Sequence, residues 1–322
     1  MTYQEKLERL VSPENFYPPE LYFRNLLGNQ VFLDALASHI ELLREFQFWD
    51  KNKIKEVQFL ILEKLISYLL ANSPFWKEYF EKRNFTAESL KSFEALERLP
   101  VIERTDLVQW GEDIYVKDKD RNPSNLFLFE RYTSGTTGEL FKTLRDERDW
   151  IVASPSCLFR NPVFSPPIIR DLLSRKSAVF LGTSGFRTVL RAFIRRLFSF
   201  SSLDLENRVL RESIYREISE ARPALLVGFA SHISRLAHYA VEDGAVLPLQ
   251  AVFITSEAIP LEEEFFIEKT FKAPVINILS SSETEHIGFE CNKNRGKFHV
   301  FSDRIILEVP KPDSAGEGEM IA

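Results

Sequence analysis

The sequence predicts an α/β fold, in which a parallel β-sheet covered by helices follows a mainly helical N-terminal region. Two observations support this prediction. Apolar residues in the first 120 positions recur at helical spacing, and from about residue 177 short apolar runs alternate with helical patterns. Strands that alternate with helices are joined by crossover connections, which build parallel sheets. We therefore expect a helical region over residues 1–120 that packs on an α/β region over residues 121–322.

The N-terminal region is expected to hold two successive helices. Val57 and Ile66 belong to a run of apolar residues at helical spacing that covers several turns. Ser73-Pro74 ends this helix, because the residue before a proline is disfavoured in the α region. A second helical segment follows at once, over residues 75–80.

A β-hairpin is predicted next. Residues 126–133 and 140–144 have the apolar pattern of strands, and a short polar loop containing glycine joins them. Gly135 and Gly138 allow this loop to turn tightly and to approach a ligand closely. Ser134, Thr136 and Thr137 add hydroxyl groups beside the backbone N–H groups, a donor set that suits a polyphosphate. The alternative is a flexible hairpin tip. A Walker A loop is excluded, because the glycine spacing is too short and no Gly-Lys-Ser/Thr follows.

The C-terminal half alternates strands and helices. Pro223 closes a helix that contains Ile214 and Ile218, Ser231 can cap the next helix, and Gly244 can end it. The expected strands cover residues 178–181, 224–229, 249–255 and 274–279, with two short β candidates within 298–309. The expected helices cover residues 188–198, the segment around 214–218, 231–244 and 262–271.

Composition excludes several classes of protein. The 322-residue chain has 41 Lys and Arg against 47 Asp and Glu, a net charge of −6, which does not suit a general binder of nucleic acid or of a membrane surface. Two cysteines exclude a disulfide framework and fit a reducing compartment. The longest apolar stretch, residues 59–71, is interrupted by Glu63 and Lys64 and is too short to span a bilayer. The N-terminus has no apolar signal segment. We therefore expect a soluble, cytoplasmic protein.

Two segments resemble motifs of the adenylate-forming superfamily, which includes acyl-CoA synthetases, peptide-synthetase adenylation domains and luciferases. Residues 132–138, Tyr-Thr-Ser-Gly-Thr-Thr-Gly, resemble its phosphate-binding loop. Residues 278–283, Ile-Leu-Ser-Ser-Ser-Glu, with Gly288 after them, resemble its aromatic-Gly-x-Ser/Thr-Glu motif. Within the superfamily, the chain looks most like phenylacetate–CoA ligases and their capsular-polysaccharide-type relatives. This resemblance runs from about residue 60 to the last residue and is carried by segments 73–80, 99–107, 222–231 and 255–258.

The resemblance implies the large N-terminal domain of the adenylate-forming fold, with residues 121–322 as the nucleotide-binding region. It implies ATP-dependent activation of a small carboxylic acid as an acyl-adenylate, then a thioester with CoA or with an acyl carrier protein. By this resemblance, the β,γ-phosphates are bound by residues of one loop: Thr133, Ser134, Gly135, Thr136, Thr137 and Gly138. The adenine contacts Ser256, Glu257, Ala258, Leu279 and Ser280. Ser282 contacts the α-phosphate, and Gly228, Phe229 and Ser231 contact the acid. Glu283 would ligate Mg²⁺, and one carboxylate beside substrate phosphates suffices for that ion.

The sequence also departs from the superfamily pattern. Glu139 stands where a lysine usually follows the loop, and Lys142 is the candidate substitute. Leu279 replaces the adenine-stacking aromatic residue, and Ser280 replaces its neighbouring glycine. The 322 residues do not include the superfamily's Arg-x-x-Asp segment or its C-terminal domain with a catalytic lysine, as expected either of a shortened chain or of a naturally reduced protein. The alternative function is therefore a catalytically reduced nucleotide- or acyl-binding module, or a partner subunit.

Three other residue groups carry weaker functional interpretations. His286, Cys291 and His299 contain metal-binding residue types, but their spacing matches no standard zinc pattern. His232 follows the expected acid segment and is a candidate for contact with substrate. Arg187, Arg191, Arg195 and Arg196 would form a solvated helix face, or a docking site for CoA phosphates or an acidic carrier protein.

Overall fold

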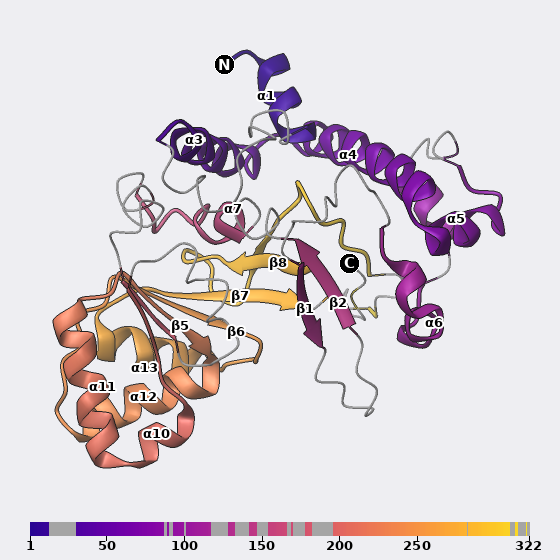
Figure 1. Cartoon of the computed structure of the whole chain (residues 1–322). Coiled ribbons are helices and arrows are strands. Elements are labelled where there is room, and N and C mark those ends of the chain that lie inside the picture. Colours follow the sequence, from indigo (N-terminus) through magenta and orange to yellow (C-terminus); the bar gives the residue numbers. More distant parts are fainter. Residues whose placement is uncertain are drawn as a thin grey trace. The chain divides into compact units, whose positions relative to one another are not determined.

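The computed structural model describes residues 1–12, 30–86, 89, 93–99, 101–116, 128–132, 142–146, 154–165, 169, 178–181, 196–281, 283–309, 313–314 and 320 (Figure 1). The chain divides into two compact units. The first, here the helical unit, comprises residues 1–15, 45–149 and 302–322. The second, here the sheet unit, comprises residues 16–44 and 150–301. A division near residue 120 stays a prediction.

The helical unit confirms the two successive helices expected from the sequence. Helix α4 ends at Asn72, and Ser73 caps α5 by accepting a hydrogen bond from the Trp76 N–H at 3.4 Å, with Pro74 at the first helical position. Ile66, Phe80 and Phe85 form a buried cluster beside these helices. The helices of this unit are α1 (Tyr3–Val11), α4 (Lys51–Asn72), α5 (Pro74–Glu81) and α6 (Arg104–Trp110), with 3₁₀ turns η3 (Phe93–Arg98) and η4 (Gly111–Ile114).

The predicted hairpin strands are present in the helical unit. Strand β1 (Leu128–Tyr132) pairs antiparallel with β2 (Lys142–Asp146), and Tyr132 lies opposite Lys142. The expected phosphate loop, with Thr133, Ser134, Gly135, Thr136, Thr137 and Gly138, lies outside the described residues. The hairpin therefore fixes where the two ends of this loop leave the strands.

The sheet unit contains a seven-stranded sheet in the order β4-β3-β5-β6-β7-β8-β9. Strands β4 to β7 run parallel, and β8 and β9 continue the sheet antiparallel. The central strands are almost entirely buried, as expected for a sheet covered on both faces. This confirms the α/β fold class. The strands are β3 (Ala178–Leu181), β4 (Arg196–Ser199), β5 (Leu225–Phe229), β6 (Ala251–Thr255), β7 (Val275–Ser281), β8 (Glu285–Glu290) and β9 (Phe298–Val300).

The helices within residues 202–271 gather on one face of this sheet (Figure 1). Apolar residues of these helices, among them Ile218, Leu236 and Ile267, form one buried cluster with Leu226 and Val252 of the strands. The helices are α10 (Ser202–Glu206), α11 (Arg208–Ala221), α12 (Ala230–Glu242) and α13 (Leu261–Phe271). The burial of this apolar surface is the main source of stability in the sheet unit.

The other face of the sheet is covered by α7 (Ser154–Leu158) and the loop after it. The Phe164 ring packs on Phe253 of β6, with centroids 5.4 Å apart. Arg44, near the end of α3 (Gln30–Phe46), organises this loop by donating to the carbonyl oxygens of Phe159 at 2.8 Å and Asn161 at 3.0 Å. Burial lowers the pKa of this guanidinium.

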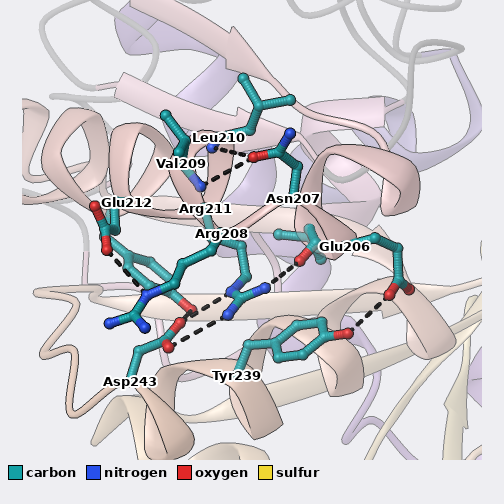
Figure 2. A network of polar contacts seen from close by, with 11 residues as sticks. Glu206, Asn207, Arg208, Val209, Leu210, Arg211, Glu212, Tyr239 and Asp243 are labelled. Atoms are coloured by element: carbon teal, nitrogen blue, oxygen red, sulfur yellow. Dashed lines mark hydrogen bonds and ion pairs between the residues drawn. The ribbon is translucent and has the colours of Figure 1, made fainter.

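Polar contacts join the helices α10, α11 and α12 to one another (Figure 2). Arg211 of α11 forms two bonds to the Asp243 carboxylate, at 2.9 and 3.3 Å, and donates to the Leu205 carbonyl at 2.9 Å. The Tyr215 hydroxyl donates to the same carboxylate at 3.1 Å. Separately, Tyr239 of α12 donates to Glu206 at 2.9 Å. The Arg211 guanidinium holds the pKa of Asp243 below its ordinary value.

Two expectations on secondary structure are wrong. Residues 196–198 belong to β4 rather than to the end of a helix, and they pair with β3. The expected helix therefore included the first residues of strand β4. Residues 188–195 of the expected helix lie outside the described residues. Ser231 does not cap α12, because the helix already begins at Ala230 and has Phe229 in the cap position. Strand β8 was not expected at all.

Candidate functional site

Three parallel strands end next to one another at the carboxyl edge of the sheet. Phe229 at the end of β5 is in register with Thr255 at the end of β6, and Thr255 is in register with Ile278 of β7. In open α/β sheets this edge is where ligands bind. The structure therefore brings together three of the predicted site segments, residues 228–231, 256–258 and 279–283.

The first segment is the turn from β5 into α12. Gly228 lies in β5, and Phe229 is the N-cap residue but offers no side-chain hydrogen bond. The backbone N–H of Ser231 donates to Oε2 of Glu257 at 2.7 Å. A carboxylate at this position satisfies one of the N–H groups that a helix start leaves without a partner, and it interacts favourably with the helix dipole. Glu257 thus replaces the capping role that the sequence assigned to Ser231.

The second segment leaves β6 through a sharp turn. Ser256 has a φ of 71°, in the left-handed region that residues other than glycine seldom adopt. Ser256, Glu257 and Ala258 are exposed. Just before them, the Thr255 hydroxyl lies 3.0 Å from the Ser280 hydroxyl and donates to the Ile278 carbonyl at 3.4 Å. The end of β6 is therefore held by side-chain bonds to β7 as well as by the ladder.

The third segment is the β7–β8 hairpin. The strand register shifts between Leu279 and Ser280, and the chain turns back through a bend in which Thr284 N–H donates to the Ser281 hydroxyl at 3.0 Å. Leu279 and Ser280 are half-buried, whereas Glu283 in the turn is exposed. Ser282 lies outside the described residues. The turn thus presents the Glu283 carboxylate to solvent at the edge where the three segments meet.

Glu283 is the residue that the sequence assigns to Mg²⁺. Among the described residues, Glu283 has no hydrogen bond or ion pair, so its carboxylate oxygens remain available as ligands. The described part of the chain contains no group of three or more His, Cys, Asp or Glu side chains that could hold a metal by itself. His286, Cys291 and His299 therefore do not form such a group. Mg²⁺ is commonly held by one or two carboxylates together with phosphate oxygens of the substrate, and a single exposed carboxylate suits that arrangement.

Gly288 has a structural explanation in the sheet. A Cβ atom at this position would lie 2.6 Å from the backbone oxygen of His299 in β9, closer than real Cβ atoms come to other atoms. Strand β9 pairs with β8 at this point, with Gly288 opposite Val300. The glycine that accompanies the predicted motif is therefore required by the close approach of two backbones.

Lys142, the candidate substitute for the phosphate-loop lysine, lies at the start of β2 in the helical unit. Its amine lies 3.2 Å from Glu112 and 3.5 Å from Glu130. These carboxylates raise the pKa of Lys142, Glu112 foremost, and so keep the amine charged. The amine is thus shared between two protein carboxylates. A role toward phosphate stays a prediction.

A buried acidic cluster in the sheet unit was not expected from the sequence. Glu264 of α13 and Glu290 of β8 each lie 3.4 Å from the Arg295 guanidinium, which also pairs with Glu268. Glu264 is 1% exposed and accepts a hydrogen bond from Asn277 at 2.9 Å. Burial, and then the neighbouring Glu290 carboxyl, raises the pKa of Glu264 to about 7. A signal was available, because Glu264 shares the helical spacing of the buried residues Ile267 and Phe271.

The comparisons with known proteins give one kind of match. No protein-family profile matches the sequence, and no curated protein is close enough to count as a relative. Among solved structures, 2-hydroxyisobutyryl-CoA ligase in complex with 2-HIB-AMP and CoA, in the thioesterification state, matches with a TM-score of 0.62 and 19% identity over 83% of this chain and 57% of that chain. An open conformation of the same ligase with 2-HIB-AMP and CoA matches with a TM-score of 0.58 and 18% identity over 94% of this chain and 62% of that chain.

These matches confirm the fold expected from the resemblance to adenylate-forming enzymes. The chain spans about three-fifths of the length of the ligase that it matches. Within the described residues, no helix is both long and apolar enough to cross a membrane.

Proposed function

We propose that this chain takes part in the ATP-dependent activation of a carboxylic acid as an acyl-adenylate, followed by transfer of the acyl group to the thiol of CoA or of a carrier protein. One observation carries the proposal. The segments predicted to bind the acid, the adenine and Mg²⁺ lie at one edge of the sheet, in a chain with the fold of a ligase solved with an acyl-AMP and CoA.

In the first step, a carboxylate oxygen of the acid attacks the α-phosphorus of ATP. A P–O bond forms, the bond to the bridging α,β-oxygen breaks, and pyrophosphate leaves with that electron pair. In this proposal the donors of Thr133–Gly138 hold the β,γ-phosphates, and Ser282 contacts the α-phosphate. Glu283 would hold Mg²⁺, which supplies charge stabilisation when bound. The contribution of the protein is positioning and electrostatic preorganisation, as in phosphoryl transfer generally.

The adenine would contact the turn formed by Ser256, Glu257 and Ala258, together with Leu279 and Ser280. Leu279 is half-buried, so part of an apolar side chain remains available to the base, without the aromatic stacking of the superfamily. Gly228, Phe229 and Ser231 would line the acid. In the second step a thiolate attacks the acyl carbonyl carbon, the thioester bond forms and AMP leaves.

A second candidate function is a nucleotide- or acyl-binding module without turnover, or a partner subunit. Two observations favour it. Glu139 stands where the superfamily has a lysine. Lys142, the only lysine among the described residues of the hairpin, has its amine shared between Glu112 and Glu130. Glu139 adds a negative charge in place of the lysine, and the two carboxylates partly neutralise the charged Lys142 amine, so less positive charge is available to the ATP phosphates.

Acid-dependent exchange between ATP and labelled pyrophosphate separates the two candidates. The assay uses the 322-residue chain with Mg²⁺ and a panel of aryl acids, fatty acids and 2-hydroxyisobutyrate. Exchange that depends on one class of acid supports the ligase proposal and identifies the class of acid. Stabilisation by Mg²⁺–ATP without any exchange supports the binding module. A chain that neither exchanges nor responds to Mg²⁺–ATP contradicts the ligase proposal and nucleotide binding, and leaves an acyl-binding module or a partner subunit.

A further inference from the structure

We propose that Glu257 is a positioning residue that fixes the start of α12 relative to the turn after β6. This inference rests on the proposed function, because it concerns the two segments assigned there to the acid and to the adenine. The proposed function assigned Glu257 to contact with the adenine. Here its role is to hold the acid segment and the adenine segment in place relative to each other. The contact that carries it is the 2.7 Å hydrogen bond from the Ser231 N–H to Glu257 Oε2.

The need for this contact arises at the start of α12. The helix has 13 residues, and its N-cap residue Phe229 has no side-chain oxygen to accept from the first N–H groups. The preferred cap residues carry an oxygen on a short side chain, and the segment offers none in that position. Water or an acceptor from another part of the chain must satisfy these N–H groups, and Glu257 provides such an acceptor for Ser231.

The direction of the Glu257 side chain follows from the turn before it. Strand β6 ends at Thr255, and the left-handed conformation of Ser256 bends the chain immediately afterwards. The bend occurs in register with Phe229, the last residue of β5. The carboxylate is thereby placed beside the neighbouring strand's helix, although the residue itself is exposed. Without the turn at Ser256, an exposed glutamate side chain would be expected to contact water rather than the Ser231 N–H.

A second bond extends the connection to the third site segment. The hydroxyl groups of Thr255 and Ser280 lie 3.0 Å apart. Side-chain bonds therefore run from the start of α12 through the turn after β6 to the β7–β8 hairpin that carries Glu283. A shift of Glu257 changes the distance between the acid segment and the adenine segment, and small errors of position at a reacting centre reduce rate strongly.

The packing of the helices does not depend on Glu257. Glu263 of α13 accepts from the Ser234 hydroxyl of α12 at 2.5 Å and lies 3.1 Å from His238 of the same helix. Both helices also belong to the buried cluster under the sheet. Replacement of Glu257 is thus expected to release the start of α12 without unfolding the unit.

The test uses three variants of the full chain. Glu257→Ala removes the acceptor, and Glu257→Gln keeps an acceptor of the same shape without the charge. Glu262→Ala is the matched control, because Glu262 is exposed in the first turn of α13 and has no hydrogen bond among the described residues. Two measurements are made on each variant: hydrogen exchange of the Ser231 amide, and the KM and kcat of acid-dependent ATP–pyrophosphate exchange.

We expect Glu257→Ala to reduce protection of the Ser231 amide by about 5- to 10-fold, as the loss of one hydrogen bond does. We expect the KM for the acid to rise about 10-fold in Glu257→Ala and by a smaller factor in Glu257→Gln, which keeps an acceptor but loses the charge, and to stay unchanged in the control Glu262→Ala. Unchanged protection in Glu257→Ala, or lost protection with an unchanged KM for the acid, overturns the positioning role alone. An original chain that shows no exchange with any acid overturns the proposed function, and the site role of Glu257 with it, even where the amide loses protection.

Discussion

Glu283 combines an exposed carboxylate with the absence of any bond to the residues that the structure describes. Glu283→Gln preserves the shape of the side chain and removes the charge that the proposal assigns to Mg²⁺. We expect Mg²⁺-dependent turnover to fall by about 10²–10³ because one electrostatic partner is lost. We expect thermal stability to be unchanged, since no packing contact is removed. Exchange kinetics and a melting curve test both parts. Unfolding of the variant would show a structural role, and normal Mg²⁺-dependent activity would show a wrong ligand assignment.

Glu264 makes the stability of the sheet unit depend on pH. Its pKa is raised to about 7 in the folded protein, above its ordinary value, so the folded state binds more protons than the unfolded state between these two values. The free energy of unfolding should therefore fall as pH rises from about 4.5 to 7, by at most about 3 kcal/mol. We expect Glu264→Gln to flatten this slope, measured by urea unfolding at several pH values. Glu262→Gln, an exposed neighbour, should keep it. An unchanged slope in Glu264→Gln would contradict the assignment.

Gly288 is a position where one methyl group is expected to be costly. A Cβ atom would meet the backbone of β9 at 2.6 Å, and a backbone atom in a paired strand cannot move as a flexible side chain does. We expect Gly288→Ala to destabilise the chain by about 1–3 kcal/mol, the usual cost of overpacking. Chemical denaturation measures this. A variant as stable as the original chain would show that β9 shifts freely at His299.

At the scale of elements, the ion pair between Arg211 and Asp243 joins α11 to the end of α12 (Figure 2). Asp243→Ala would leave a guanidinium whose residue is only 6% exposed without its carboxylate. Loss of one partner of a buried pair costs about 3–5 kcal/mol, and the partial exposure of Asp243 places the expected loss near the lower end. Glu212→Ala is the control, because its pair with Arg208 is exposed and should contribute less than about 0.5 kcal/mol. Equal losses in the two variants would contradict this difference.

Some elements of the fold can be predicted from the sequence and others cannot. Strands β5 and β6 can be recognised in the sequence because a strand buried on both faces reads as a continuous apolar run. Strand β8 was missed because Glu285 and Glu290 interrupt that pattern although both are buried. The partner of the Ser231 N–H lies 26 residues further along the chain. Local capping rules consider only neighbours in sequence, so a distant acceptor cannot be recognised from them.

For the whole molecule, the fold and the grouping of three site segments follow from the sequence, because successive crossovers place successive strand ends at one edge. The acidic cluster and the Glu257 contact required the structure, since they join residues far apart in the chain.

Binding of Mg²⁺–ATP is expected to raise the thermal stability of the whole chain. A ligand that binds only the folded state stabilises it, by about 2.7 kcal/mol at one hundred times its dissociation constant. We therefore expect the melting temperature to rise with millimolar Mg²⁺–ATP, and to rise less for Glu283→Gln. Calorimetry with ATP in EDTA is the control. No shift in the original chain would count against nucleotide binding by this edge.

The succession of β5, α12, β6, α13 and β7 has a consequence for the order of folding. These elements are neighbours both along the chain and in the sheet, so their contacts close only short loops. Contacts of small sequence separation form early and quickly, and the separations are smallest in the hairpins that join β7 to β8 and β8 to β9. Residues 225–300 therefore hold the most local contacts of the sheet unit, and we expect the segments of the candidate site to assemble in the same folding step.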